Sequence, residues 1–166
     1  MISYQLANLG WDVSEHLGDG YDLLGVTTQA GSQIVAKIEL KAVDLHSYLE
    51  KASFSQAVSE NEISTATHLI ISIFNVIKPE GHFIMSLRQA FNAVKSKRTK
   101  KFEEYNNFNT FQKAAIQISQ KKILHRKGKK EKLNRLALDI GCTFRKFSEN
   151  KWELGIFRNQ WDNLLR

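Results

Sequence analysis

The chain has 166 residues, 42% of them hydrophobic and 25% charged, and 24 Lys and Arg against 17 Asp and Glu give a net charge of +7. This composition fits one globular domain, and the single cysteine, Cys142, excludes a disulfide framework and a cysteine-rich zinc site. No stretch approaches 18 consecutive apolar residues, and the N-terminus lacks the basic and apolar regions of a signal peptide. We therefore expect a soluble, cytoplasmic protein without a membrane partner.

The first quarter of the chain predicts a short helix followed by strands. Residues 2–9 form the helix, which ends at Gly10, and a first strand begins at Trp11. Residues 21–28 are rich in apolar and β-branched side chains and predict a second strand. After a turn at Ala30 and Gly31, residues 34–42 alternate, with apolar side chains at even positions and charged ones at odd positions from Lys37 onward. This period of two predicts a half-buried strand.

The remainder predicts helices with one buried strand. Residues 55–67 are expected to form a helix, with a cap at Ser59 and Glu62 at the third helical position. The apolar run 68–77 predicts a buried strand that stops at the segment 78–81, which contains Pro79, with a core helix as the alternative. Further predicted elements are helices at 86–97, 110–124 and 129–136, and a late hairpin formed by 142–147 and 151–157.

The positive charge is concentrated in one segment. Residues 95–135 contain 14 basic and three acidic residues, a net charge of +11, so the rest of the chain carries −4. Such asymmetry indicates a polyanion partner, although a solvated helical surface with incidental lysines would have the same composition. The candidate nucleic-acid contacts are Lys97, Arg98, Lys100, Lys101, Lys121, Lys122, Arg126, Lys127, Lys129 and Lys130.

The predicted hairpin brings two carboxylates together. If Ala30 and Gly31 are the central turn residues, Asp22 lies opposite Glu39, and the Cβ atoms of such a pair are about 5 Å apart on one face. Two carboxylates at this separation suit a hard divalent cation such as Mg²⁺, and Lys41 points to the same face. The alternative is a surface strand whose alternating charges pair across the hairpin as ordinary salt links.

Asp22, followed by a hairpin to Glu39-Leu40-Lys41, resembles the signature of the PD-(D/E)XK nuclease superfamily, which includes restriction endonucleases. The resemblance covers residues 1–78. It implies a restriction endonuclease-like α/β core (αβββαβ, a mixed sheet flanked by helices) in which Asp22 and Glu39 bind Mg²⁺ or Mn²⁺ and Lys41 is the catalytic lysine. The chain departs from many members because Tyr21 replaces a proline and residues 1–9 contain no acid, which leaves Glu15 or Asp19 as a source of a third carboxylate.

These observations predict one domain with a nuclease core at 1–90, a basic helical extension at 91–140, and a C-terminal hairpin or helix at 141–166 that packs on the core. The expected function is metal-dependent hydrolysis of DNA phosphodiester bonds, with RNA as an open alternative substrate, by a homodimer. The alternative is a non-catalytic nucleic-acid-binding or interaction module that retains the nuclease fold.

Overall fold

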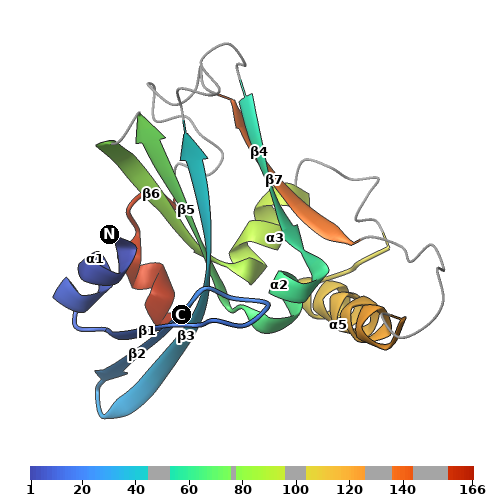
Figure 1. The fold of residues 1–166 in the computed structure, drawn as a ribbon, viewed down its shortest axis with the longest axis horizontal. Helices are drawn as coiled ribbons and strands as arrows, with labels where there is room; N and C mark the ends of the chain where they lie inside the picture. Colours follow the sequence, from blue (N-terminus) through green and yellow to red (C-terminus); the bar gives the residue numbers. More distant parts are fainter. Residues whose placement is uncertain (45–52, 76–77, 96–103, 126–135, 144–156) are drawn as a thin grey trace.

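The protein is an α/β structure built on a five-stranded mixed sheet flanked by helices (Figure 1). The computed structural model describes residues 1–44, 53–75, 78–95, 104–125, 136–143 and 157–166. The elements of the first half are α1 (Ile2–Asn8), β1 (Asp12–Glu15), β2 (Leu23–Gln29), β3 (Ser32–Asp44), β4 (Ser53–Ser59), α2 (Glu60–Thr65) and β5 (His68–Asn75). Those of the second half are β6 (Lys78–Ser86), α3 (Leu87–Lys95), α5 (Phe108–His125), β7 (Ala137–Thr143) and the 3₁₀ helix η4 (Trp161–Leu165).

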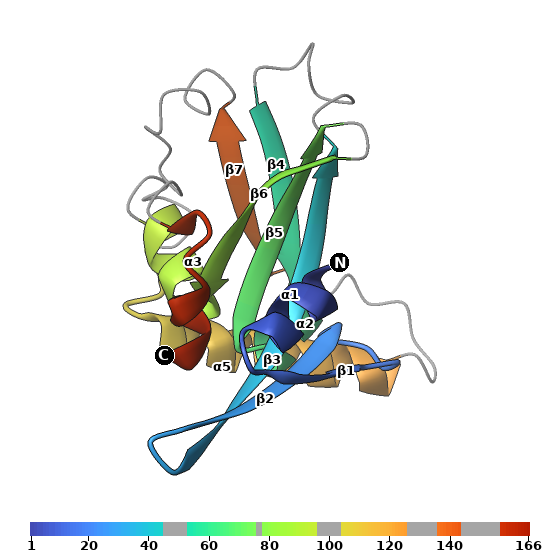
Figure 2. The same cartoon turned by 90° about the vertical axis from the view of Figure 1, so that its left-hand side faces the viewer.

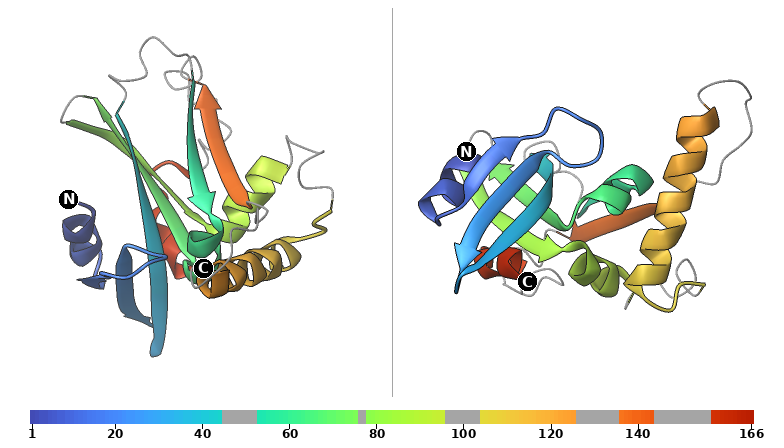
Figure 3. Two further views of the ribbon diagram at one scale, coloured as in Figure 1. Left: turned by 45° about the vertical axis from the view of Figure 1, so that its right-hand side comes forward. Right: turned by 90° about the horizontal axis from the view of Figure 1, so that it is seen from below.

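The main sheet has the strand order β1-β2-β3-β5-β6. Strands β3 and β5 are parallel, and the other neighbouring pairs are antiparallel. Parallel neighbours need a long crossover, which here passes through β4 and α2. Strand β4 pairs with β7 in a separate two-stranded sheet. The two sheets diverge toward the end of the molecule where β3 ends and β4 begins (Figures 1 and 3).

The turn between β2 and β3 has the predicted position and fixes the predicted register. Ala30 and Gly31 both have positive φ angles, 50° and 79°, as the two central residues of a tight hairpin turn often do. Leu23 pairs with Ile38 and Gly25 with Ala36, which is the register expected from a turn centred on these residues.

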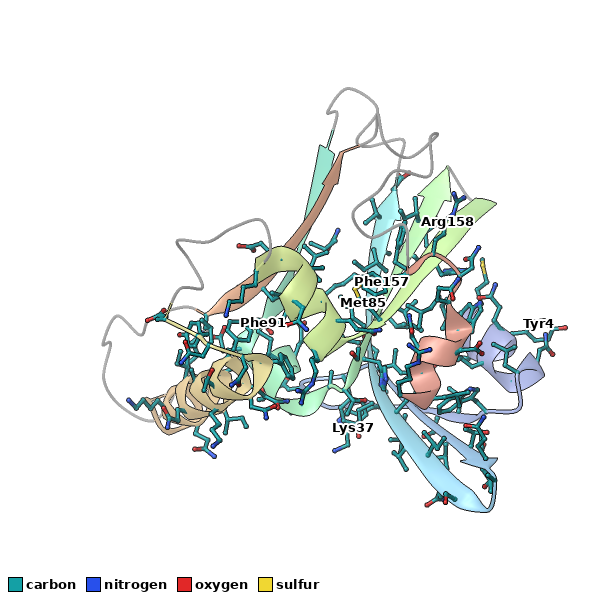
Figure 4. All side chains as sticks on the ribbon, turned by 180° about the vertical axis from the view of Figure 1, so that it is seen from behind. Tyr4, Lys37, Met85, Phe91, Phe157 and Arg158 are labelled. Atoms are coloured by element: carbon teal, nitrogen blue, oxygen red, sulfur yellow. The ribbon has the colours of Figure 1, made fainter. Side chains whose placement is uncertain are left out.

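The two faces of the main sheet bury separate hydrophobic clusters. On one face, Ile38 and Ile70 pack with Leu6 of α1 and Leu164 of η4. Figure 2 shows these two helices on the same side of the sheet. On the other face, a larger cluster joins the sheet to α2, α3, α5 and the β4–β7 pair, and Figure 4 shows Phe91 of α3 within it. Side chains of β5 alternate between these clusters, as its near-continuous apolar sequence requires for a strand buried on both faces.

Several predicted elements are confirmed. They are the helix at 2–9, the strands at 21–28, 34–42 and 68–77, and the helices at 86–97 and 110–124, with other ends that differ by one or two residues. Residues 76–77 and 96–97 of these ranges lie outside the described residues. The predicted helix at 129–136 lies almost wholly outside the described residues, as does most of the late hairpin. None of the described helices is both long and apolar enough to cross a membrane.

One prediction is wrong and one strand was missed, each for a physical reason. The expected helix at 55–67 is a strand up to Ser59, because β4 pairs with the distant β7, and helix begins only at Glu60. The strand predicted at 68–77 does end before Pro79, but a separate strand, β6, begins at Lys78, and the sequence did not predict it. A proline is tolerated there because β6 is the last strand of the main sheet and the pairing is irregular at Ile73 and Phe74.

Candidate active site at the base of the β2–β3 hairpin

Asp22 is fixed at the point where β2 begins. Its backbone N–H donates to the carbonyl of Ile38 at 2.9 Å, and its Oδ2 accepts a hydrogen bond from the N–H of Leu40 at 2.7 Å. The regular β2–β3 ladder ends at the pair of Leu23 and Ile38, so the Asp22 side chain satisfies a β3 donor that lies beyond the paired residues. Asp22 therefore contacts the two residues on either side of Glu39 in β3. The register extrapolated from the turn predicts a direct pair between Asp22 and Glu39, and the ladder ends before that pair.

Glu39 and Lys41 project from the same face of β3 and are in contact. The Lys41 ammonium lies 2.6 Å from Oε1 of Glu39 and 2.9 Å from Oε1 of Glu62, so one lysine bridges two carboxylates. Glu39 is buried, and the Lys41 side chain is 17% exposed. This face of β3 is the one that packs toward α2, which explains why a helix residue completes the cluster.

Glu62 is positioned by the start of α2. The Ser59 hydroxyl accepts from the backbone N–H of Glu62, and Oε2 of Glu62 accepts from the N–H of Ser59 at 2.7 Å, which makes a capping box. The other oxygen of Glu62 contacts Lys41. The sequence predicted the capping box correctly, but the contact with Lys41 depends on the packing of α2 against β3 and could not be read from local spacing.

Burial and pairing shift the pKa values of this cluster in different directions. Burial raises the pKa of Glu39 to about 7, despite its hydrogen bond from Lys41. Burial alone would lower the pKa of Lys41, but its hydrogen bonds to Glu39 and Glu62 outweigh burial and raise it. For Glu62, burial is likewise outweighed by hydrogen bonds from Lys41 and Ser59, so its pKa is lowered. Lys41 is consequently a cation at neutral pH, while Glu39 is close to its titration point.

The donor chemistry of Asp22 and Glu39 fits a hard divalent cation. Both supply carboxylate oxygens, and Asp22 is exposed, so the cluster is open to solvent on that side. With Glu62 included, all three carboxyl groups ionised and Lys41 protonated, the cluster would carry a charge of −2, which one divalent ion would neutralise. A cation beside Glu39 would also favour its charged form, which burial disfavours. Within the described residues, no three His, Cys, Asp or Glu side chains form a group ready to hold a metal, so the candidate ligands are this pair.

The structure describes two of the ten candidate nucleic-acid contacts. Lys122 on α5 forms an ion pair with the buried Glu60 of α2, so its charge is neutralised by a carboxylate within the fold. Lys121 has an exposed side chain on the same helix. The other eight lie outside the described residues: Lys97, Arg98, Lys100, Lys101, Arg126, Lys127, Lys129 and Lys130.

Comparison with protein families, curated proteins and solved structures gave no family model, no curated protein and no solved structure that matches this chain.

Proposed function

We propose that this protein is a metal-dependent endonuclease that hydrolyses DNA phosphodiester bonds at Asp22, Glu39 and Lys41. The observation that carries the proposal is the arrangement of these groups, in which the Asp22 carboxylate is anchored at Leu40, between Glu39 and Lys41. A structural salt link would need only one carboxylate for one lysine. Here one lysine pairs with two carboxylates, and the backbone N–H between Glu39 and Lys41 anchors a third.

The order of elements supports the nuclease core. The chain runs α1-β1-β2-β3, then α2 and β5, which is the αβββαβ order that the resemblance to PD-(D/E)XK nucleases implies. Strand β4 is an addition between β3 and α2. Glu39 and Lys41 lie on β3 and Asp22 directly precedes β2, an arrangement compatible with that resemblance.

Each group has a distinct role in the proposed reaction. Asp22 and Glu39 would hold Mg²⁺ or Mn²⁺, which lowers the pKa of a bound water and offsets charge on the phosphate. Lys41, kept protonated by its two carboxylate partners, orients the attacking water as a hydrogen-bond donor and stabilises the charge that develops on the phosphate oxygens. Glu62 holds Lys41 in place and is a positioning residue.

Cleavage of plasmid DNA with Mg²⁺ or Mn²⁺ tests this proposal. Asp22→Asn, Glu39→Gln and Lys41→Met should each lower the cleavage rate by a factor of about 100 or more, because each removes a group that acts on the transition state. EDTA should abolish cleavage. The matched controls Asp12→Asn and Lys113→Met change exposed residues of the same types on β1 and α5, and they should cleave as the wild type does.

Two results would contradict the proposal. Metal-dependent cleavage that survives Glu39→Gln and Lys41→Met in folded protein would place the reaction elsewhere. Salt-sensitive binding of DNA or RNA without cleavage under any metal would instead identify a binding module that retains the fold.

A further inference from the structure

The loop between β1 and β2, residues 16–22, places an aromatic pair beside the candidate active site. The rings of His16 and Tyr21 are stacked, with centroids 4.1 Å apart and an angle of 15° between their planes. Tyr21 directly precedes Asp22, and the backbone N–H of His16 donates to the carbonyl of Asp22 at 2.8 Å. The stacked pair is therefore tied by main-chain contacts to the residue proposed to bind the metal.

Two glycines allow the loop to hold this shape. A Cβ atom on Gly18 would lie 2.5 Å from Nε2 of His16, so a larger residue here would displace the imidazole from its present position. Gly20 has a φ of 121°, and a Cβ atom there would lie 2.2 Å from the hydroxyl of Thr65. The loop thus packs tightly on the last turn of α2. Tyr21 is partly buried against the larger hydrophobic cluster, which anchors its ring, whereas His16 is exposed.

Leu17 and Lys37 flank the aromatic pair. Leu17 follows His16 and is 98% exposed, the most exposed large hydrophobic residue among those the structure describes. Lys37 lies on the same face of β3 as Glu39, one strand repeat or about 7 Å away, and its ammonium is 5.7 Å from the centre of the Tyr21 ring. Figure 4 shows Lys37 projecting outward at the surface near the base of the hairpin.

A single exposed leucine is common on protein surfaces and by itself indicates nothing. Together, however, an exposed imidazole stacked on a partly buried tyrosine, an adjacent apolar side chain and a cation are groups that proteins use to bind unstacked bases. Aromatic rings stack on bases, apolar side chains insert between them, and lysines contact the phosphates. In an intact duplex the base faces are covered by their neighbours, so such a surface favours DNA in which a base is unpaired.

We propose that the β1–β2 loop binds an unstacked nucleobase next to the phosphate to be cleaved, so that the substrate is single-stranded, gapped or otherwise distorted DNA. His16 provides the stacking face, Leu17 inserts beside the base, and Lys37 contacts a neighbouring phosphate. This inference rests on the proposed function, since it assigns the substrate class of the same site.

Binding measured in EDTA separates this inference from catalysis. Fluorescence anisotropy is recorded with a fluorescein-labelled 20-nucleotide single strand, a gapped duplex and an intact duplex. We expect the single strand and the gapped duplex to bind about tenfold more tightly than the intact duplex. His16→Ala and Leu17→Ser should weaken binding to those two substrates about tenfold and leave the intact duplex unchanged, in line with the usual contribution of one stacked base. Leu9→Ser, an exposed leucine at the end of α1, is the matched control and should bind as the wild type does.

A stacking probe gives a second readout that a loss of folding would not imitate. With 2-aminopurine in the single strand, wild-type protein should change the probe's fluorescence through stacking, and His16→Ala should remove that change while Leu9→Ser keeps it. A wild type that prefers the intact duplex, or loop variants that bind all substrates like the wild type, would overturn the inference even if metal-dependent cleavage is found. Failure to bind any oligonucleotide would overturn it as well and would leave Leu17 as a protein contact.

Discussion

His68 is a buried histidine whose neutral form the fold requires. It begins β5, is 5% exposed, and its Nδ1 lies 2.8 Å from the hydroxyl of Thr67. Burial lowers the pKa of His68 from 6.5 to about 4. Between these values the unfolded chain binds a proton at this residue and the folded protein does not, so stability rises with pH from about 4 to 6.5. His68 alone should contribute about 3 kcal/mol to that change.

Urea unfolding at pH 5.0 and 7.0, in EDTA, tests this prediction with His68→Asn, which keeps a polar group near the Nδ1 position but does not titrate. Glu39 acts in the opposite direction, because its raised pKa means that the folded state holds a proton that the unfolded state has released. The change in unfolding free energy between the two pH values is therefore compared between the wild type and His68→Asn, so that the contribution of Glu39, which both proteins share, cancels. The wild type should lose more stability than His68→Asn on going from pH 7.0 to 5.0, and equal losses would contradict the assignment.

At the scale of elements, the β2–β3 turn contains a residue, Ala30, in a backbone conformation that is unfavourable for alanine. Ala30 has a φ of 50°, a region in which the Cβ of an L-residue is crowded and which asparagine tolerates better. Ala30→Asn should therefore stabilise the protein by about 1 kcal/mol and raise its melting temperature by about 2–4 °C. Gly31→Ala, at a φ of 79°, should lower the melting temperature. A melting temperature for Ala30→Asn at or below that of the wild type would contradict the turn geometry.

A second prediction concerns the contact between α2 and α5. Glu60 is 4% exposed and forms an ion pair with Lys122, so removal of the lysine leaves a buried carboxylate without its partner. Lys122→Met should destabilise the protein by about 2 kcal/mol, less than for a fully buried pair because the lysine is partly exposed. The double variant Glu60→Gln, Lys122→Met should recover much of this loss in denaturant unfolding. Lys113→Met, an exposed lysine on the same helix, should have little effect, and an equal loss there would show that the pair is unimportant.

These elements show what local sequence can and cannot predict. The alternation in β3 and the turn at Ala30 and Gly31 determine the hairpin and its register, because both act within about twenty residues. Local sequence predicts helix where β4 lies, because this strand depends on its pairing with β7, in which Val58 pairs with Leu138, eighty positions away. For the same reason local sequence does not predict the role of Glu62. Its capping box is local, but its contact with Lys41 forms only because the crossover from β3 to β5 packs α2 against β3. The backbone pairing of β2 with β3 also ends at Leu23, one residue before Asp22. At Asp22 the side chain accepts the hydrogen bond from the N–H of Leu40.

At the scale of the whole molecule, charge is divided between two regions. The segment 95–135 carries +11, whereas the candidate active site and the rest of the chain lie in a part with −4. If DNA is the substrate, the basic segment supplies affinity through phosphate contacts and the carboxylates supply the chemistry. The ion pair of Lys122 with Glu60 shows that lysines in the segment are not equivalent, since this one stabilises the fold.

That distinction predicts how DNA binding depends on salt. Each phosphate neutralised by a lysine contributes about 0.7 to the slope of log affinity against log salt for a single strand and about 0.9 for a duplex. The triple variant Lys127→Gln, Lys129→Gln, Lys130→Gln should therefore lower the slope by about 2 or more, measured by anisotropy in EDTA over a range of salt concentrations. The double variant Glu60→Gln, Lys122→Gln removes a charge pair whose lysine is already neutralised within the fold, so the slope should change by less than 1. A triple variant with the wild-type slope would show that these lysines do not contact phosphates. A large change in the double variant would show that Lys122 leaves Glu60 to bind DNA.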